Sequence, residues 1–172
     1  MIADMFPVFV EGRRITLREV EHGDLLVAQE LSDHVSRGTL GPLDWMTEAM
    51  IAAESSPRTR YALAVEHEGD VVGLVSLVVE ADESRGEIGY AIVAGHRRDG
   101  IATEAVGLLC RFAFDVVGLR RVFALTAVDN VASVAVLVRA GFVREGRLRS
   151  HDGGDVDTYF FGLLVDDDPG AG

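Results

Sequence analysis

Apolar and polar positions along the chain follow the period of a β-strand in some stretches and that of an α-helix in others. Residues 61–67 and 71–80 alternate or run apolar, and Glu68-Gly69-Asp70 separates them. A short polar break containing glycine between two such runs predicts a β-hairpin. After Gly100 the apolar residues recur at the helical period, which predicts a helix that ends at Gly118. Its apolar positions are Ile101, Ala105, Leu108, Leu109, Phe112 and Val116.

The same pattern over the whole chain predicts one α/β domain, residues 1–172, with loosely ordered ends at 1–12 and 166–172. The expected order is one strand, two helices, three strands, a helix, a strand, a helix and two strands. This order gives a mixed, mostly antiparallel sheet of about seven strands with about four helices on its faces. The expected strands are 15–20, 61–67, 71–80, 86–93, 122–128, 142–148 and 156–164. Besides the helix after Gly100, the expected helices are 21–35, 44–55 and 130–140.

The charge of the chain limits its partners. The formal net charge is −12, and all 16 basic residues are arginine. Such an acidic chain is a poor candidate for nucleic-acid binding, where basic side chains supply most of the affinity. It would attract a cationic substrate such as a protonated amine or a basic peptide, although solubility alone also accounts for the charge. Because lysine is absent, any phosphate site must use arginine side chains and backbone N–H groups.

Composition argues against several further classes of protein. The chain is 48% hydrophobic and 26% charged, as in a globular domain. No apolar run reaches the roughly 20 residues that cross a bilayer, and the first residues lack a secretory signal, so we expect a cytoplasmic protein without a membrane partner. The five histidines lack the spacing of metal ligands, so no metal is expected. Cys110, the one cysteine, is expected to be a small buried side chain.

The most informative segment is the loop between the strand at 86–93 and the following helix, Gly95-His-Arg-Arg-Asp-Gly-Ile-Ala-Thr-Glu-Ala105. A helix N-terminus presents unpaired N–H groups and the positive end of the helix dipole, which together bind anions. Gly100 and Ala102 are small enough to let a pyrophosphate approach the backbone, and Arg97 and Arg98 add positive charge. On these residues alone, a solvated turn accounts for the loop equally well.

Two motifs in this order resemble the GNAT family of acetyltransferases. Arg97-x-x-Gly100-x-Ala102 is similar to the family's R-x-x-G-x-G/A signature, and residues 130–142 are similar to its later helix and strand. The continuation, with Glu145-Gly-Arg-Leu-Arg149 and Asp157-x-Tyr159, resembles the RimJ/RimL branch, which acetylates N-terminal amines of ribosomal proteins. The resemblance runs from about residue 15 to 164, and it implies a GNAT fold with acetyl-CoA as co-substrate.

The resemblance also implies where acetyl-CoA is held. In the family the loop grips the pyrophosphate, and the edge of the preceding strand pairs with the pantetheine amides. A backbone N–H at a splayed bulge of that strand stabilises the oxyanion, and by position it belongs to Ile92 or Val93. Arg98 departs from the family, since many relatives have glycine there; it either stiffens the loop or contacts phosphate. The implied loop contacts are Arg97, Arg98, Asp99, Gly100, Ile101, Ala102 and Thr103.

Glu87 is the candidate general base, because it lies on that strand and resembles the acidic residue that many relatives use directly or through water. Alternatively, Glu87 only forms an ion pair with Arg85 or another arginine. Glu104 is a weaker candidate, since the helix dipole alone explains an acidic residue in a first turn. The strand period places Glu87, Gly89 and Ala91 on one face and Ile88, Tyr90 and Ile92 on the other.

The general acid is predicted on the helix at 130–140. Many relatives carry a tyrosine where this chain has Leu137, whereas the RimJ/RimL pattern has a serine at the position of Ser133. These two residues are four apart and share a helix face, so the serine is expected to reach the same sulfur atom. Asn130, Ser133 and Leu137 are also predicted cofactor contacts. The alternative is that Asn130 and Ser133 only cap the helix.

Together these residues predict an N-acetyltransferase that passes acetyl directly to a primary amine in a ternary complex. The RimJ/RimL resemblance favours a protein N-terminus as acceptor, and a small amine such as an aminoglycoside, polyamine or amino acid is the alternative. A module that binds acyl-CoA without turnover is the rival from another class. Trp45 and Met46 lie in the region that walls the acceptor pocket in this family, with a core role as the alternative. Relatives are often dimers, so a homodimer is expected by analogy.

Overall fold

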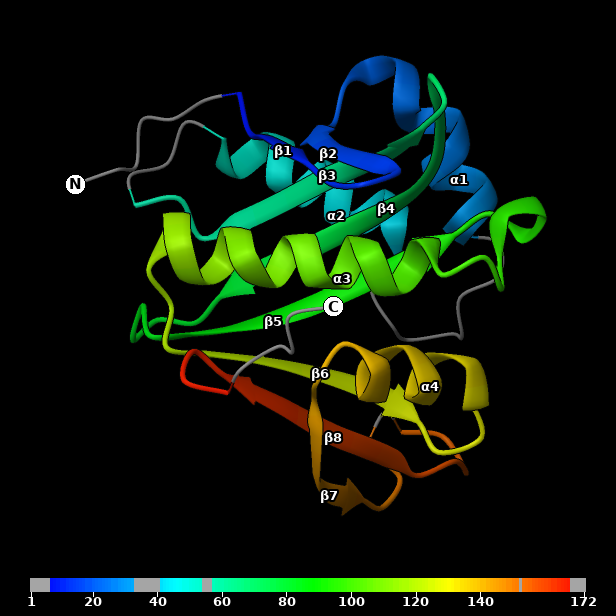
Figure 1. The fold of residues 1–172 in the computed structure, drawn as a ribbon. Helices are drawn as coiled ribbons and strands as arrows, with labels where there is room; N and C mark the ends of the chain where they lie inside the picture. The colour runs from blue at the N-terminus through cyan, green and yellow to red at the C-terminus, as the bar shows by residue number, and fades with distance from the viewer. Residues whose placement is uncertain (1–6, 33–40, 54–56, 152, 168–172) are drawn as a thin grey trace.

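The protein is described by a computed structural model that covers residues 7–32, 41–53, 57–151 and 153–167 (Figure 1). These residues form an eight-stranded sheet in the order β1-β2-β3-β4-β5-β6-β8-β7. Neighbouring strands are antiparallel except β5 and β6, which run parallel. The strands are β1 (Phe9–Glu11), β2 (Ile15–Glu19), β3 (Arg60–His67), β4 (Asp70–Val79), β5 (Arg85–Ile92), β6 (Arg121–Ala127), β7 (Val143–Leu148) and β8 (Thr158–Leu164). The helices are η1 (His22–Asp24), α1 (Leu25–Ser32), α2 (Pro42–Ala52), η2 (Ala94–His96), α3 (Ile101–Arg111), η3 (Phe112–Val117) and α4 (Val131–Arg139).

The predicted α/β class and order of elements are confirmed, with one strand more than expected. β1 pairs with β2 from Phe9↔Arg18 to Glu11↔Thr16, so the prediction of a loosely ordered end through residue 12 is wrong for these residues. A strand this short leaves too few positions for its period to be recognised. The predicted helix ends at 33–35 and 54–55 lie outside the described residues, as do positions 1–6 and 168–172. No described helix is long and apolar enough to cross a membrane.

In two turns a glycine adopts the left-handed backbone conformation that the turn requires. The predicted hairpin joins β3 to β4 through Glu68 and Gly69, with φ values of +53° and +90°, and two successive positive φ values are those of a type I′ turn. Gly118, with φ +84°, ends the long helix after Gly100 as predicted. The last part of that helix, η3, is a π-helix, which the period of the apolar residues does not distinguish from an α-helix.

Helices cover both faces of the sheet (Figure 1). α3 and α4 share one core with strand residues such as Leu63 and Val65. α1 and α2 share a second core with Ala62 and Ala64, on the opposite face. All four of these β3 residues are fully buried, which explains why the strand reads as a nearly continuous apolar run. The alternation along each central strand therefore sorts its side chains between the two cores.

The sheet opens between β5 and β6. Their described pairing covers Arg85↔Arg121, Gly86↔Val122 and Glu87↔Phe123. Beyond this point β5 stays paired with β4 and β6 with β8, while the two strands move apart. We call the space between residues 88–92 of β5 and 124–127 of β6 the β5–β6 opening. The N-terminal end of α3 lies toward its open side (Figure 1), because α3 is the crossover that connects these parallel strands.

Candidate active site

The loop before α3 has the features of an anion site. Glu104 is the first residue whose N–H donates back along the helix, to the Gly100 carbonyl oxygen (3.0 Å). The N–H groups of Ile101, Ala102 and Thr103 therefore have no partner within the helix. Gly100 has φ +79°, a left-handed conformation that glycine adopts without cost, and glycine has no side chain to cover these N–H groups. The loop thus fits a pyrophosphate at the positive end of the helix.

The two loop arginines are held differently. The Arg97 Nε donates to the Ile92 carbonyl oxygen (2.8 Å), which ties the loop to the end of β5. Arg98 is exposed and has φ +69°, a conformation that costs a residue with a side chain about 1–2 kcal/mol. The loop conformation therefore explains why a glycine suits this position, and it places the Arg98 side chain in solvent beside the loop.

A distant turn, which no local sequence pattern predicts, also reaches the loop. The Glu104 carboxylate accepts hydrogen bonds from the N–H groups of Arg13 (2.7 Å) and Arg14 (2.8 Å) and from the Arg14 Nε (3.2 Å). A Cβ built on Gly100 would lie 3.2 Å from the Arg14 Nη2, so this guanidinium stands beside the N-terminus of α3. Arg14 and Glu104 are 90 positions apart, and no local pattern pairs residues so far apart. Arg14 brings a third guanidinium beside the loop, with its charge balanced by the Glu104 carboxylate.

The hydrogen bonds to Glu104 also set its pKa. Burial on its own would raise this pKa, but the hydrogen bonds from Arg14 and Arg13 outweigh it, and the pKa lies below its ordinary value of 4.5. Glu104 is therefore ionised at neutral pH and anchors the β1–β2 turn to α3. This structural role replaces the weak prediction that Glu104 acts as a base.

Replacing Glu104 by glutamine is expected to lower the free energy of unfolding by about 1–2 kcal/mol at neutral pH, because charge-assisted hydrogen bonds are weakened. The pKa is lowered by folding, so the stabilisation is complete above the ordinary value and is lost as pH falls through the folded value. Urea titrations should therefore show wild type and variant converging in acid. Glu11→Gln, on the exposed edge of β1, is the control. If the free energies of unfolding of wild type and variant differed equally at neutral and at acid pH, the anchoring role would be contradicted.

The two faces of β5 belong to different cores, as its alternation predicts. Ile88 and Ile92 lie in the core of α3 and α4, and Tyr90 packs against it. Ala91 packs against the core of α1 and α2. Glu87 shares the face of Ala91 and is half-buried. Since it is the last β5 residue in the described pairing with β6, it stands where the β5–β6 opening begins.

The surroundings of Glu87 bear on its predicted role. Arg85, its proposed ion-pair partner, is paired with Glu80 (2.6 Å) and Asp82 (3.1 Å). On the same face, a Cβ built on Gly89 would lie 2.6 Å from the Trp45 Cζ2, so the indole rests on the strand backbone two residues from Glu87. Trp45 is half-buried and also packs against the core of α1 and α2, which supports the core alternative; its role as a pocket wall stays a prediction.

Met46 and Cys110 are core residues. Met46 is fully buried between α2 and the sheet, which confirms the core alternative. Cys110 is also buried, and burial raises the pKa of its thiol to about 12. A thiol in this state is not a nucleophile at neutral pH, so the prediction of a small buried side chain is confirmed.

Hydrogen bonding distinguishes the two predicted oxyanion donors. The Val93 N–H donates to the Val72 carbonyl oxygen of β4 (2.9 Å), so it is not available to a ligand. Successive N–H groups of a strand point to opposite edges, and the Ile92 N–H therefore points to the β5–β6 opening. Of the two predicted oxyanion donors, only the Ile92 N–H remains a candidate. The Val93 N–H is instead part of the hydrogen-bond ladder between β4 and β5.

α4 carries the remaining predicted contacts. The Asn130 Oδ1 accepts a hydrogen bond from the Ser133 N–H (3.1 Å), which confirms that Asn130 caps the helix. Leu137 is 0% exposed and lies in the core beneath α4. The prediction that Leu137 contacts the cofactor is therefore wrong, because protein atoms enclose its side chain. Ser133 is half-buried, and its hydroxyl contacts Tyr90 of β5.

Tyr90, for which sequence analysis predicted no role, forms hydrogen bonds with Ser133. The Tyr90 Oη lies 2.9 Å from the Ser133 Oγ and 3.1 Å from the Ser133 carbonyl oxygen. Tyr90 belongs to β5 and Ser133 to α4, so the pair links the two sides of the opening. Burial raises the pKa of Tyr90 to about 12, against a smaller lowering by its side-chain hydrogen bond with Ser133. Glu87 and the Tyr90–Ser133 pair thus flank the opening from opposite faces of the sheet.

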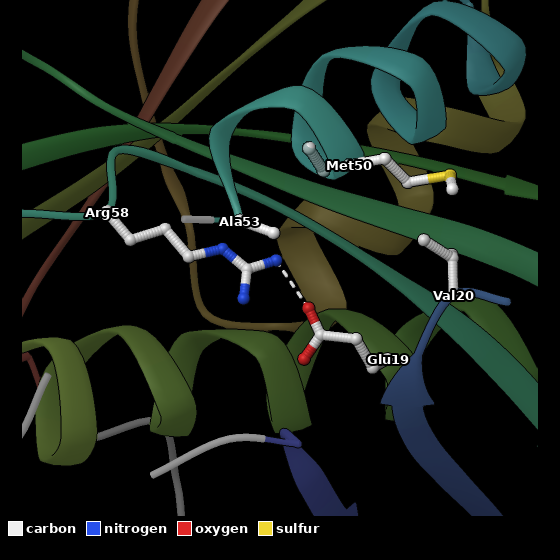
Figure 2. A pocket seen from close by; sticks show the side chains of 6 residues that line it. Glu19, Val20, Met50, Ala53 and Arg58 are labelled. Atoms are coloured by element: carbon white, nitrogen blue, oxygen red, sulfur yellow. Dashed lines mark hydrogen bonds and ion pairs between the residues drawn. The ribbon is translucent and has the colours of Figure 1, made fainter. Parts of the chain in front are cut away.

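The pocket in Figure 2 lies apart from these groups. It measures about 170 Å³. Arg58 is buried there, is paired with Glu19, donates from Nε to the Arg60 carbonyl oxygen (2.9 Å) and lies 4.7 Å from the centre of the Tyr61 ring. These contacts describe an ion pair that joins β2 to the start of β3 rather than a ligand site. The lining residues are Glu19, Val20, Ala49, Met50, Ala53 and Arg58.

The fold defines the class of the protein. The structure superposes on Mycobacterium smegmatis RimJ in complex with CoA-disulfide with a TM-score of 0.80 and 23% identity, covering 96% of this chain and 91% of RimJ. It superposes on the Vibrio cholerae spermidine N-acetyltransferase in complex with CoA and spermine with a TM-score of 0.76 and 20% identity, covering 90% of this chain and 97% of that one. Both likenesses show the acetyltransferase fold.

The sequence match shows the family. A family model described as the acetyltransferase (GNAT) domain matches residues 14–143, and the chain therefore belongs to the GNAT acetyltransferases. YoaA of Bacillus subtilis (strain 168), described as an uncharacterized N-acetyltransferase, is 30% identical over 177 residues, covering 93% of this chain and 98% of YoaA. The predicted enzyme class, N-acetyltransferase, is confirmed at this level.

Proposed function

We propose that this protein transfers the acetyl group of acetyl-CoA directly to a primary amine bound in the same complex. The observation that carries the proposal is the β5–β6 opening, with Glu87 on one face, Ser133 on the other and the anion-binding loop at its end. The RimJ and spermidine N-acetyltransferase structures are described as complexes with CoA-disulfide and with CoA, which supports a CoA thioester as the donor.

The loop and the edge of β5 would hold the donor. When bound, acetyl-CoA supplies an acetyl thioester whose thiolate can leave. The N–H groups of residues 101–103 hold the pyrophosphate, and Arg97, Arg98 and Arg14 offset its charge. The edge of β5 beyond Glu87 offers N–H and carbonyl groups to the pantetheine amides. The Ile92 N–H donates to the carbonyl oxygen as negative charge develops on it.

Glu87 and Ser133 would move the protons. Glu87, directly or through a water molecule, accepts a proton from the ammonium form of the acceptor, so that the neutral amine attacks the carbonyl carbon. As the carbon–sulfur bond breaks, the sulfur takes its electron pair. The nitrogen of the tetrahedral adduct releases its second proton to water as the amide forms. The Ser133 hydroxyl donates its hydrogen to the sulfur, and a proton from water restores the hydroxyl. Trp45 walls the acceptor side of the opening beside Glu87.

We propose a protein N-terminus as the acceptor. The RimJ/RimL-like residues Glu145–Arg149 and Asp157-x-Tyr159 and the likeness to RimJ support this choice. The net charge of −12 favours a cationic acceptor of either size. A polyamine is the second candidate, because the spermidine N-acetyltransferase superposes almost as well.

A thiol-release assay with acetyl-CoA across a panel of amines tests the proposal. The panel contains N-terminal peptides of ribosomal proteins, the same peptides already acetylated, spermidine, an aminoglycoside and free amino acids. We expect kcat/KM at least about 10-fold higher for one peptide than for any small amine, a difference of about 1.4 kcal/mol. A higher value for spermidine would replace the peptide by a polyamine. Acetyl-CoA binding without turnover on any acceptor would favour the non-catalytic module.

A further inference from the structure

We infer that Tyr90 is a positioning residue that fixes the Ser133 hydroxyl so that its hydrogen faces the sulfur leaving in the opening. The inference rests on the proposed function. It is carried by two contacts of one phenol: the Tyr90 Oη lies 2.9 Å from the Ser133 Oγ and 3.1 Å from the Ser133 carbonyl oxygen. A hydroxyl that reaches both oxygens of the same residue restricts where its side chain can turn.

The orientation matters because a serine hydroxyl is otherwise mobile. Its χ1 torsion has three staggered positions, and the hydroxyl hydrogen rotates further. The Ser133 N–H is already bound by the Asn130 Oδ1 (3.1 Å), so the backbone of this turn is fixed and only the side chain remains to be placed. The single phenol hydrogen of Tyr90 is shared in a three-centre bond between the Ser133 Oγ (2.9 Å) and the Ser133 carbonyl oxygen (3.1 Å). With Oγ as an acceptor, the serine hydrogen is directed away from Tyr90 and is left for another acceptor.

Tyr90 is suited to this role by its own environment. Its ring packs against the core of α3 and α4, between the buried residues Ile88 and Ile92 of β5. Burial raises the pKa of its phenol to about 12, so the hydroxyl keeps its proton at neutral pH and serves as a donor rather than as an acid. In the transfer step Tyr90 therefore loses no proton, and the hydrogen that reaches sulfur belongs to Ser133.

A double-mutant cycle in the thiol-release assay tests this dependence. We expect Tyr90→Phe to lower kcat about 5- to 20-fold with little change in KM for acetyl-CoA, because the ring is kept and only the orientation is lost. In a Ser133→Ala background the same change should alter kcat by less than about 2-fold. Tyr61→Phe, which removes a phenol hydroxyl from β3, is the matched control. A further large loss in the Ser133→Ala background would show that Tyr90 acts on the sulfur itself, and would overturn the inference.

A binding measurement tests the same inference without turnover. Free CoA carries the thiol that the acetyl group leaves, and its ionisation is followed by thiolate absorbance in a pH titration of the complex. A hydrogen bond from Ser133 favours the thiolate, so Tyr90→Phe and Ser133→Ala should each raise the pKa of the bound thiol by about 0.5 to 1. Cys110 does not interfere, since its pKa is about 12. Unchanged thiol pKa values in variants that bind CoA would refute the role of Tyr90, whereas failure of the wild type to bind CoA would refute the proposed function.

Discussion

Replacing Gly100 by valine is expected to weaken acetyl-CoA binding by at least about 50-fold, or about 2.3 kcal/mol. Gly100 has φ +79°, a region that a β-branched residue adopts only under strain. The N–H groups of residues 101–103 follow directly, so any shift that relieves the strain also moves the donors of the anion site. The loss of one or two charge-assisted hydrogen bonds accounts for the expected magnitude. Isothermal titration calorimetry measures the affinity.

Gly95→Ala is the matched control for this substitution. Gly95 lies in the same connection, its φ is not in the left-handed region, and no atom lies within 4 Å of a Cβ built there. The Gly95→Ala protein should therefore bind acetyl-CoA as the wild type does. Urea titration of both variants separates lost binding from lost folding, and Gly100→Ala provides a milder strain if the valine variant does not fold. Unchanged affinity in a folded Gly100→Val protein would mean that the pyrophosphate lies elsewhere.

Replacing Glu87 by glutamine is expected to lower kcat by about 100-fold or more while the affinity for acetyl-CoA stays the same. General base catalysis contributes effects of this size, and glutamine keeps the shape of the side chain without its basicity. Glu87 lies on the Trp45 side of β5 and is not part of the loop predicted to hold the cofactor, so binding should not change. Single-turnover kinetics with a saturating amine isolates the acetyl-transfer step.

The pH dependence strengthens this test. With Glu87 as the base, kcat/KM of the wild type falls at low pH as the carboxylate is protonated, and the variant loses this limb of the profile. Glu30→Gln, on the exposed side of α1, is the control for charge alone. A Glu87→Gln protein with wild-type kcat on its best acceptor would assign Glu87 a purely structural role, and the base would have to be sought elsewhere.

Much of the fold follows from local physical chemistry. β3, β4, the hairpin between them and the helix after Gly100 were predicted from apolar periods and glycines, because these signals act over a few residues. The side-chain alternation of β5 was also predicted, and it correctly separated Glu87 from Tyr90. The anion site could be predicted in the same way, since a strand, a polar loop and a helix N-terminus are consecutive in the chain.

The errors arose where one segment depends on another. β1 was missed because its three residues form a strand only through pairing with β2. Leu137 was expected at the cofactor because it shares a helix face with Ser133, but packing beneath α4 encloses it. Val93 and Ile92 look alike in sequence, and only the partner strand β4 decides which N–H remains available.

The sequence by itself therefore determined the class of fold, the strand–loop–helix order that predicts an anion site and the faces of β5, because each depends on neighbouring residues and their periods. Only the tertiary structure decided how the site is assembled. It brought Arg14 to Gly100 through Glu104, and it joined Tyr90 to Ser133 across 43 positions of the chain. Such contacts depend on sheet order and helix packing, which no period along the chain encodes.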